Sequence, residues 1–213
     1  MICYPMAHCK RPVLIDIDTQ SHFFRPRGPM CIQNHRQVLT NIRKVMKWAQ
    51  AKQISTFSTL QVHQSHAVFR QTRKGARLST EKPRGTLHPK HICFASSDRM
   101  DWSADTWEHY DQVIIQKRTF DPFEEPRADR ILTELSTQEC ILIGNPVEGA
   151  VKATALGLLL RQKRVTIVSD AIGCLDPILG ASSWEHLHSK NIQFVSADHL
   201  VRTSPRTPLA AIH

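Results

Sequence analysis

The chain has 213 residues, of which 41% are hydrophobic and 22% are charged, as in an ordinary soluble globular protein. These values fit one domain over residues 1–213, whereas two full domains would be cramped. No apolar run is long enough to span a membrane, and the first ten residues lack the order of a signal peptide, so we expect a cytoplasmic protein with no membrane partner.

The six cysteines are scattered along the chain and include no Cys-x-x-Cys pair. Such spacing indicates neither a zinc knuckle nor a disulfide framework. We therefore expect most of them to be small apolar residues in a reducing compartment.

The net charge of +9 is unevenly distributed, because basic residues crowd one segment. A solvated or subunit-bridging loop is the first interpretation, capture of an anionic substrate the second, and nucleic-acid binding the third. The segment has a single aromatic residue, Phe69, at its edge and so lacks a base-stacking array. Its basic residues are Arg70, Arg73, Lys74, Arg77, Lys82 and Arg84.

The first predicted elements are a strand, a helix and a second strand. Residues 13–18 form a short apolar run that ends at Asp18. Residues 33–52 place apolar side chains at spacings of three and four, which predicts an amphipathic helix. Residues 54–60, rich in Thr, Ser and Phe, suit a strand.

From about His63 to Tyr110 the periodicity is weak, and Pro, Gly, Ser and charges are common. A long irregular segment inside a compact domain is usually functional or an oligomer contact. Within and next to it, a helix over 62–72 and short extended pieces at Thr86-Leu87 and 92–94 are candidates.

The second half of the chain alternates strands with helices. Four further strands are expected at 113–117, 140–144, 164–169 and 192–195, and helices are expected from Pro126 onward and over 150–161 and 182–190. Such alternation implies right-handed crossovers and a parallel sheet covered on both faces. We predict a three-layer α/β/α Rossmann-like domain with a six-stranded parallel sheet, a core over about 12–201 and a loose C-terminal tail at 203–213.

Ligands of α/β sheets bind at the carboxyl ends of the strands, where helix N-termini offer unpaired amides. The strand at 140–144 is followed by a sharp turn at that edge of the sheet. A nucleophile would be expected where this turn leads into the next helix. Alanine stands at that position, Ala150. Asp18 and Lys117 also end strands, so they are expected at the same edge as a possible proton-exchanging pair; a turn or capping role for Asp18 is the alternative.

Four segments resemble the motifs of the isochorismatase-like, or cysteine hydrolase, superfamily. Asp18-Thr-Gln-Ser-His-Phe-Phe resembles its Asp-x-Gln-Asn-Asp-Phe opening, and Lys117-Arg-Thr-Phe-Asp-Pro-Phe resembles its Lys-x-x-x-Ser-Ala-Phe segment. Gly144-Asn-Pro-Val-Glu-Gly-Ala-Val-Lys-Ala-Thr-Ala resembles Gly-Val-x-Thr-Asp-x-Cys-Val-x-x-Thr-Ala, and Val168-Ser-Asp-Ala resembles Val-x-Asp-Ala. The resemblance runs from about residue 12 to residue 201, with the motifs in the right order.

The resemblance implies a catalytic triad of Asp, Lys and Cys, in which the thiolate attacks a carbonyl. Asp18 and Lys117 carry over, but the cysteine position is Ala150, and a methyl group cannot act as a nucleophile. Cys140 lies at the wrong end of its strand and Cys174 follows the next strand, so neither is expected to substitute. The resemblance also implies a branch without the cysteine, in which the Asp protonates a vinyl ether and water captures the resulting oxocarbenium-like species.

The turn after the fourth strand is expected to bind a ligand oxygen. The resemblance implies a cis peptide just before the oxyanion-binding amides, and proline lowers the cost of that isomer. We therefore predict a cis Asn145-Pro146 bond, with the amides of Gly149 and Ala150 free to face a ligand.

A metal site is not expected, and neither is another cofactor. Nicotinamidases in the superfamily hold a metal through an Asp-x-His…His pattern, and the corresponding residues look like Gln61-Val-His63 with His66 nearby. The acid is missing, so a hydrogen-bonded or surface histidine pair is favoured over a metal site.

Two departures make the expected pocket more charged than the family norm. Asp16 replaces an aliphatic residue in the first strand, and a buried acid there needs a partner such as a basic residue on a neighbouring element. Asp121-Pro122 replaces Ser-Ala beside Lys117, so nicotinamide is a poor candidate substrate. The pocket candidates are Gln20, Phe23, Arg118, Phe123 and Glu148.

Three functions remain open. The first is an isochorismatase-type hydrolase of a small molecule that uses Asp18 as an acid, and the second is a pseudoenzyme that binds a metabolite or a protein. The third, a basic nucleic-acid-binding module, is the least favoured. By the resemblance we also expect a homo-oligomer, with the 63–110 segment as a candidate contact.

Overall fold

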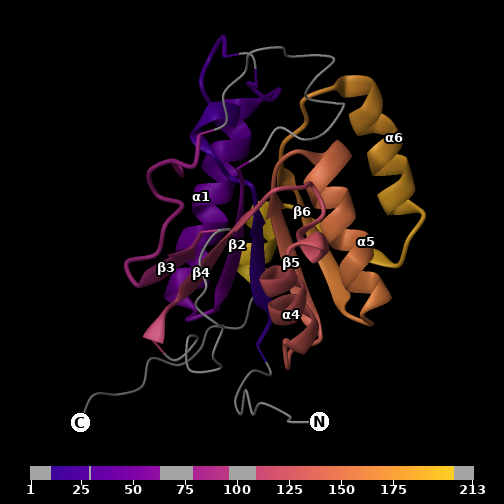
Figure 1. Cartoon of the computed structure of the whole chain (residues 1–213). Helices are drawn as coiled ribbons and strands as arrows, with labels where there is room; N and C mark the ends of the chain where they lie inside the picture. Colours follow the sequence, from indigo (N-terminus) through magenta and orange to yellow (C-terminus); the bar gives the residue numbers. More distant parts are fainter. Residues whose placement is uncertain (1–10, 29, 63–78, 96–108, 204–213) are drawn as a thin grey trace.

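The computed structural model describes residues 11–28, 30–62, 79–95 and 109–203. A parallel sheet of seven strands has the order β3-β4-β2-β1-β5-β6-β7 (Figure 1). The strands are β1 (Val13–Ile17), β2 (Thr56–Gln61), β3 (His91–Phe94), β4 (Gln112–Lys117), β5 (Glu139–Gly144), β6 (Arg164–Ile172) and β7 (Ile192–Val195). The predicted parallel α/β sheet is confirmed.

Helices cover both faces of the sheet, which completes the three predicted layers (Figure 1). The α-helices are α1 (His35–Ala51), α4 (Pro126–Glu134), α5 (Lys152–Leu160), α6 (Pro177–His188) and α7 (Ala197–Thr203). Short 3-10 turns lie at η1 (Ser21–Phe23) and η2 (Pro122–Glu124), and a π-helical turn lies at η3 (Val147–Val151). No helix in the described part of the chain is long and apolar enough to cross a membrane.

Alternation along the strands divides the core into two layers. Val13, Ile15 and Ile17 of β1 point to the layer that holds the apolar faces of α4, α5 and α6. Leu14 points to the opposite layer, where α1 and α7 pack. Strand β1 therefore buries residues on both faces, as a central parallel strand must.

The predicted count of six strands is wrong, because β3 adds a seventh. It has only four residues, of which His91 and Cys93 are exposed, and it lies at the edge of the sheet. So short and half-exposed a segment carries little periodicity, although residues 92–94 were a candidate extended piece. Thr86 and Leu87, the other candidate, form bends instead. The candidate helix over 62–72 lies outside the described residues, apart from residue 62.

Several boundaries differ from prediction for local reasons. Helix α6 begins at Pro177 rather than at 182, because the Asp176 side chain accepts hydrogen bonds from the amides of Ile178 and Leu179 at 2.9 and 3.1 Å. Strand β6 continues to Ile172 rather than stopping at 169, and α7 was not predicted. Beyond Thr203, the predicted tail lies outside the described residues.

The strand order places the functional candidates together. Strand β1 lies in the middle of the sheet between β2 and β5, and β4 is next to β2. Because all these strands are parallel, the residues after β1, β4 and β5 meet at one carboxyl edge.

Candidate functional site

Asp18 and Lys117 form a buried ion pair at the carboxyl edge of the sheet. The Lys117 Nζ atom lies 2.7 Å from Asp18 Oδ2, and the side chains of the lysine and the aspartate are 0% and 1% exposed. Asp18 directly follows β1, and Lys117 is the last residue of β4. The prediction that the strand ends bring this acid and this lysine together is confirmed.

Strand β2 lies between the two charges and gives each a polar partner. Thr59 Oγ1 donates to Asp18 Oδ1 at 2.7 Å. Gln61 Oε1 and the Thr119 carbonyl accept from Lys117 Nζ at 2.8 and 3.0 Å. Burial lowers the pKa of Lys117, and the neighbouring Asp18 carboxylate opposes this shift. Both charges are thus hydrogen-bonded, which is the condition for keeping them in a dry site.

Sequence reasoning missed Thr59, and it considered Gln61 only at the position of a metal-site acid, not as a partner of Lys117. The signal that could have found them is the register between neighbouring strands, in which Gln61 of β2 pairs with Lys117 of β4. Polar residues at the end of β2 must therefore reach the same edge as the lysine.

Residues 144–151, here called the elbow, lie next to Asp18. Gly144 has φ +123°, and a Cβ there would stand 1.9 Å from the Ile17 carbonyl oxygen, so only glycine fits. The Asn145 amide donates to the same carbonyl at 2.8 Å. The Asn145-Pro146 bond is cis, as predicted.

Ala150, the position of the nucleophile in the resemblance, is fully buried in the apolar layer beneath α5. Its carbonyl accepts from Thr154 Oγ1 at 2.7 Å. The Gly149 amide donates to the Pro146 carbonyl at 3.3 Å, so the prediction that this amide is free for a ligand is wrong. The π-helical turn causes the difference, because it folds the elbow back on its own carbonyl groups.

Two polar pocket candidates, Gln20 and Glu148, form hydrogen bonds with backbone groups. Gln20 is buried and donates through Nε2 to the carbonyls of Gln61 and Ser79 at 3.1 and 2.6 Å, while its Oε1 accepts from the Gln61 amide at 2.9 Å. Glu148 Oε1 accepts from the amides of Leu175 and Asp176, both at 2.8 Å. These side chains hold the site's framework through backbone groups, and their role as ligand contacts stays a prediction.

The aromatic pocket candidates are packing residues. Phe23 is 1% exposed and belongs to the apolar layer of α1. Phe123 packs on α5, where a Cβ on Gly157 would stand 2.1 Å from its ring, and the Arg161 guanidinium lies 3.8 Å from the ring centroid. Both rings therefore contribute to packing, and a pocket role for Phe23 and Phe123 stays a prediction. Arg118, the last candidate, has an exposed side chain.

The predicted basic partner of Asp16 is Lys82. Lys82 Nζ lies 2.6 Å from Asp16 Oδ2, and the side chains of the lysine and the aspartate are 1% and 0% exposed. For Lys82 the interpretation of the basic segment as a solvated loop is therefore wrong, whereas Arg84 is exposed. The other four residues of that group, Arg70, Arg73, Lys74 and Arg77, lie outside the described residues.

Neither of the two thiols considered as substitutes for the missing cysteine is activated. Burial raises the pKa of Cys140 to about 12, and burial together with Glu148 raises the pKa of Cys174 to about 12. A thiol with so high a pKa stays neutral at physiological pH and is a poor nucleophile.

Within residues 11–28, 30–62, 79–95 and 109–203, no group of three or more His, Cys, Asp or Glu residues is placed to hold a metal ion. His63 and His66, which the sequence analysis compared with the metal-binding motif of nicotinamidases, lie outside these ranges. A cavity of about 680 Å³ lies at the opposite, amino-terminal edge of the sheet, between Trp48, Arg164 and Leu200. It is remote from the strand ends that carry Asp18 and Lys117.

Comparisons with known proteins agree with the fold. The model of the isochorismatase domain matches residues 12–198. A search of curated proteins gives no match.

Similar solved structures include a cysteine hydrolase from Pseudomonas syringae pv. phaseolicola, at 15% identity and a TM-score of 0.67, with 90% of this chain and 91% of that chain covered. An isochorismatase-like hydrolase from Alkaliphilus metalliredigens is 18% identical with a TM-score of 0.66, and the coverage is 90% and 95%. A ribonuclease from Caenorhabditis elegans is 17% identical with a TM-score of 0.58, and the coverage is 90% and 79%. Likeness at such identities shows the fold alone.

Proposed function

This chain belongs to the isochorismatase family, and from that premise we propose that it hydrolyses a small molecule with Asp18 and Lys117 and without a covalent nucleophile. The observation that carries the proposal is the buried 2.7 Å contact between Lys117 Nζ and Asp18 Oδ2, next to an elbow in which alanine, Ala150, occupies the position that the resemblance gives to the nucleophile. A methyl group has no lone pair, so a thiol-dependent amidohydrolase is excluded.

The chemistry open to this pair is proton transfer. A protonated Asp18 gives its proton to the terminal carbon of a vinyl ether, which leaves an oxocarbenium ion at the carbon bearing the ether oxygen. Water adds to that carbon and returns a proton to Asp18, and the resulting hemiketal collapses to a ketone and an alcohol. One water is consumed and the carboxyl group is regenerated, so the cycle needs no other reactant.

Lys117 has two opposed effects on this step. As a cation it stabilises the Asp18 carboxylate, and as a donor at 2.7 Å it can pass its own proton to Asp18. Burial lowers the pKa of Lys117, and the Asp18 carboxylate opposes this shift. Under this proposal the two side chains exchange one proton in a buried site.

A second function is binding of a metabolite or protein without turnover. It is favoured by the two donors on Asp18, because Thr59 Oγ1 and Lys117 Nζ both stabilise the ionised carboxylate rather than the acid. Under this alternative the pair is a fixed part of a binding pocket.

A panel of small vinyl ethers, esters and amides, assayed with the purified protein, distinguishes the two functions. The hydrolase proposal expects turnover of vinyl ethers and none of amides. Raised melting temperature without turnover supports the binding protein, and turnover of amides contradicts both.

Nucleic-acid binding remains the third candidate, and it rests on the net charge of +9. Binding of a polynucleotide through phosphate contacts must weaken steeply as salt rises. Absence of such binding at low salt rejects it.

We also propose that the protein forms a homo-oligomer. We propose no membrane partner. The solution mass by light scattering tests the proposal, since a monomeric mass of about 24.3 kDa would contradict it.

A further inference from the structure

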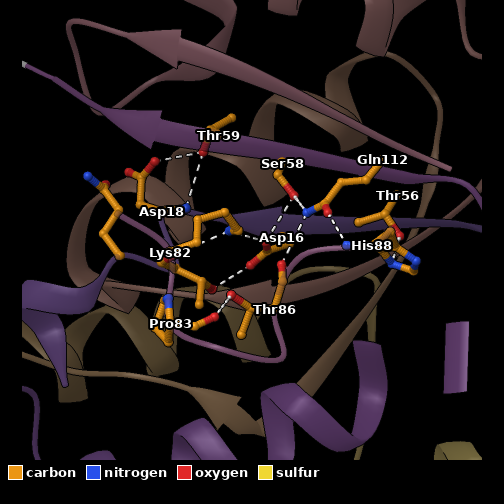
Figure 2. A network of polar contacts seen from close by, with 12 residues as sticks. Asp16, Asp18, Thr56, Ser58, Thr59, Lys82, Pro83, Thr86, His88 and Gln112 are labelled. Atoms are coloured by element: carbon orange, nitrogen blue, oxygen red, sulfur yellow. Dashed lines mark hydrogen bonds and ion pairs between the residues drawn. The ribbon is translucent and has the colours of Figure 1, made fainter. Parts of the chain in front are cut away.

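A second buried polar network lies beside Asp18 on β1 (Figure 2), and its centre is Asp16. Asp16 Oδ2 accepts from Lys82 Nζ at 2.6 Å and from Ser58 Oγ at 2.9 Å, and its Oδ1 accepts from Thr19 Oγ1. Lys82 Nζ also donates to the Thr19 carbonyl at 3.2 Å. None of these residues is more than 7% exposed, so the contacts are made away from water.

The network continues across the sheet to β4. Gln112 Nε2 donates to Ser58 Oγ at 2.8 Å and to the Thr86 carbonyl at 3.3 Å, and Gln112 Oε1 accepts from the His88 amide at 2.8 Å (Figure 2). His88 Nε2 lies 3.1 Å from Thr56 Oγ1 on β2. Residues 79–88, here called the strap, contain no helix or strand and are held to β1, β2 and β4 by these contacts.

A gain in folding stability does not explain why a buried ion pair, Asp16–Lys82, is found at this place. Desolvating two charges costs about as much as their attraction returns, so an apolar pair of similar volume would serve equally well in a core. What an apolar pair cannot do is donate to a backbone carbonyl, and Lys82 does so at Thr19.

The contacts of the pair converge on the backbone around Asp18. Asp18 has φ +48°, in the left-handed region that residues other than glycine seldom adopt. Thr19, which follows it, is held through its hydroxyl by Asp16 and through its carbonyl by Lys82. One ion pair, which includes Asp16 two residues before Asp18, therefore fixes the residue that directly follows Asp18.

The strap also reaches the lysine of the site. The Ser79 carbonyl accepts from Gln20 Nε2 at 2.6 Å, and Gln20 Oε1 accepts from the Gln61 amide at 2.9 Å. Gln61 Oε1 in turn accepts from Lys117 Nζ at 2.8 Å. Both charges of the candidate site are thus connected to the same ten-residue stretch, 79–88.

We propose that Lys82 is a positioning residue, which through Asp16 and the Thr19 carbonyl fixes the Asp18 carboxylate against Lys117 and the elbow. The functional meaning of this role rests on the proposed use of Asp18 and Lys117. The competing explanation is that Lys82 only neutralises Asp16.

The double variant Asp16→Leu with Lys82→Met separates the two explanations. It removes both charges together and leaves an apolar pair, so neutralisation is no longer needed and the chain is expected to fold. The positioning role is lost, because methionine cannot donate to the Thr19 carbonyl.

The reporter is a thiol introduced by Ala150→Cys, whose alkylation rate is followed against pH. In this background alone, the midpoint of the pH profile is expected below about 8.5, the value of a free cysteine, because Asp18 and Lys117 lie beside the elbow. Adding Asp16→Leu and Lys82→Met is expected to raise the midpoint by about one pH unit, which lowers the rate at pH 7 about tenfold.

The matched control is Arg84→Gln, an exposed basic residue of the same strap, which is expected to leave the midpoint unchanged. Circular dichroism checks that every variant is folded. An unchanged midpoint in the folded double variant overturns the proposal. Because the reporter needs no substrate, the result is independent of whether the protein hydrolyses anything.

Should the introduced thiol stay unreactive in every background, a crystal structure of the double variant without Ala150→Cys decides. The positioning role expects the Lys117 Nζ to Asp18 Oδ2 distance to lengthen beyond hydrogen-bonding range from 2.7 Å. An unchanged distance overturns it.

Discussion

Two buried ion pairs start from the same strand, yet they are held in different ways. Asp18–Lys117 joins the ends of β1 and β4, two strands whose places are set by the register of the sheet. Asp16–Lys82 joins β1 to the strap, which contains no helix or strand. The two pairs have similar contact distances, 2.7 and 2.6 Å, and similar burial.

The comparison shows that equal geometry does not imply an equal role. The first pair lies at the carboxyl edge of the sheet, where the elbow begins with a hydrogen bond from the Asn145 amide to the Ile17 carbonyl. The second pair lies on the sheet face beneath the strap, and its contacts end on backbone and on other side chains (Figure 2). Substitutions in the first pair should therefore change the chemistry, and substitutions in the second should change folding and orientation.

Asp18→Asn is expected to have the largest effect, because an amide cannot deliver the proton that the vinyl-ether mechanism requires. We expect kcat/KM to fall by about 10²- to 10⁴-fold. Steady-state kinetics on a substrate of the panel measures this, with Asp198→Asn, an exposed acid paired with Lys44, as the control. Activity retained within twofold would show that the first pair carries no chemistry.

Lys82→Met is expected to destabilise the fold by about 3–5 kcal/mol, because it leaves the Asp16 carboxylate buried without its counter-charge. Urea unfolding measures the change. The Asp16→Leu and Lys82→Met double variant should recover most of the loss. If the double variant is as unstable as the single variant, charge burial is not what distinguishes the second pair.

Acid should weaken the strap through His22. The Ser79 amide donates to His22 Nδ1 at 3.1 Å, and burial lowers the pKa of His22 to about 4 from 6.5. Between these values the unfolded chain binds a proton that the folded chain does not. The contribution is therefore complete above pH 6.5 and is lost as the pH falls toward 4, by roughly 3 kcal/mol.

Unfolding free energy measured from pH 7.5 to pH 4 tests this effect, with His22→Gln as the comparison. The variant should show a shallower fall than the natural chain. His88, whose pKa burial also lowers, contributes with the same sign in both proteins. Equal slopes of unfolding free energy against pH in the two proteins would mean that protonation of His22 does not destabilise the fold.

Lys44→Met should have the smallest effect on the free energy of unfolding, because the Lys44–Asp198 pair is exposed despite its 2.6 Å contact. Urea unfolding again measures it. The exposed pair is the reference for the buried pairs. If Lys44→Met lowered the free energy of unfolding as much as Lys82→Met does, burial would not explain the effect of Lys82→Met.

The sequence predicted the first pair better than the second for a physical reason. Asp18 and Lys117 end periodic strands, so the rule that parallel strands share an edge places them together. The need of Asp16 for a partner also followed from its apolar neighbours. Lys82 itself could not be identified, because an irregular segment has no period from which its contacts can be derived.

The contacts of the pocket candidates could not be predicted for a related reason. Sequence proximity to Asp18 and Lys117 does not say which way a side chain points. Phe123 turns to α5 and Glu148 turns to the amides of Leu175 and Asp176. Such orientations depend on the 3-10 and π-helical turns after β4 and β5, and these turns have no hydrophobic pattern of their own.

The most direct test of the central claim is vinyl-ether hydrolysis in D₂O, with the product followed by proton NMR. If Asp18 protonates the terminal carbon, that carbon becomes a methyl group that carries one deuterium per turnover, and Asp18→Asn abolishes the signal. Absence of turnover by a folded protein across the vinyl ethers, or an equal rate of deuterium incorporation by Asp18→Asn, would contradict the claim that Asp18 and Lys117 act without a nucleophile.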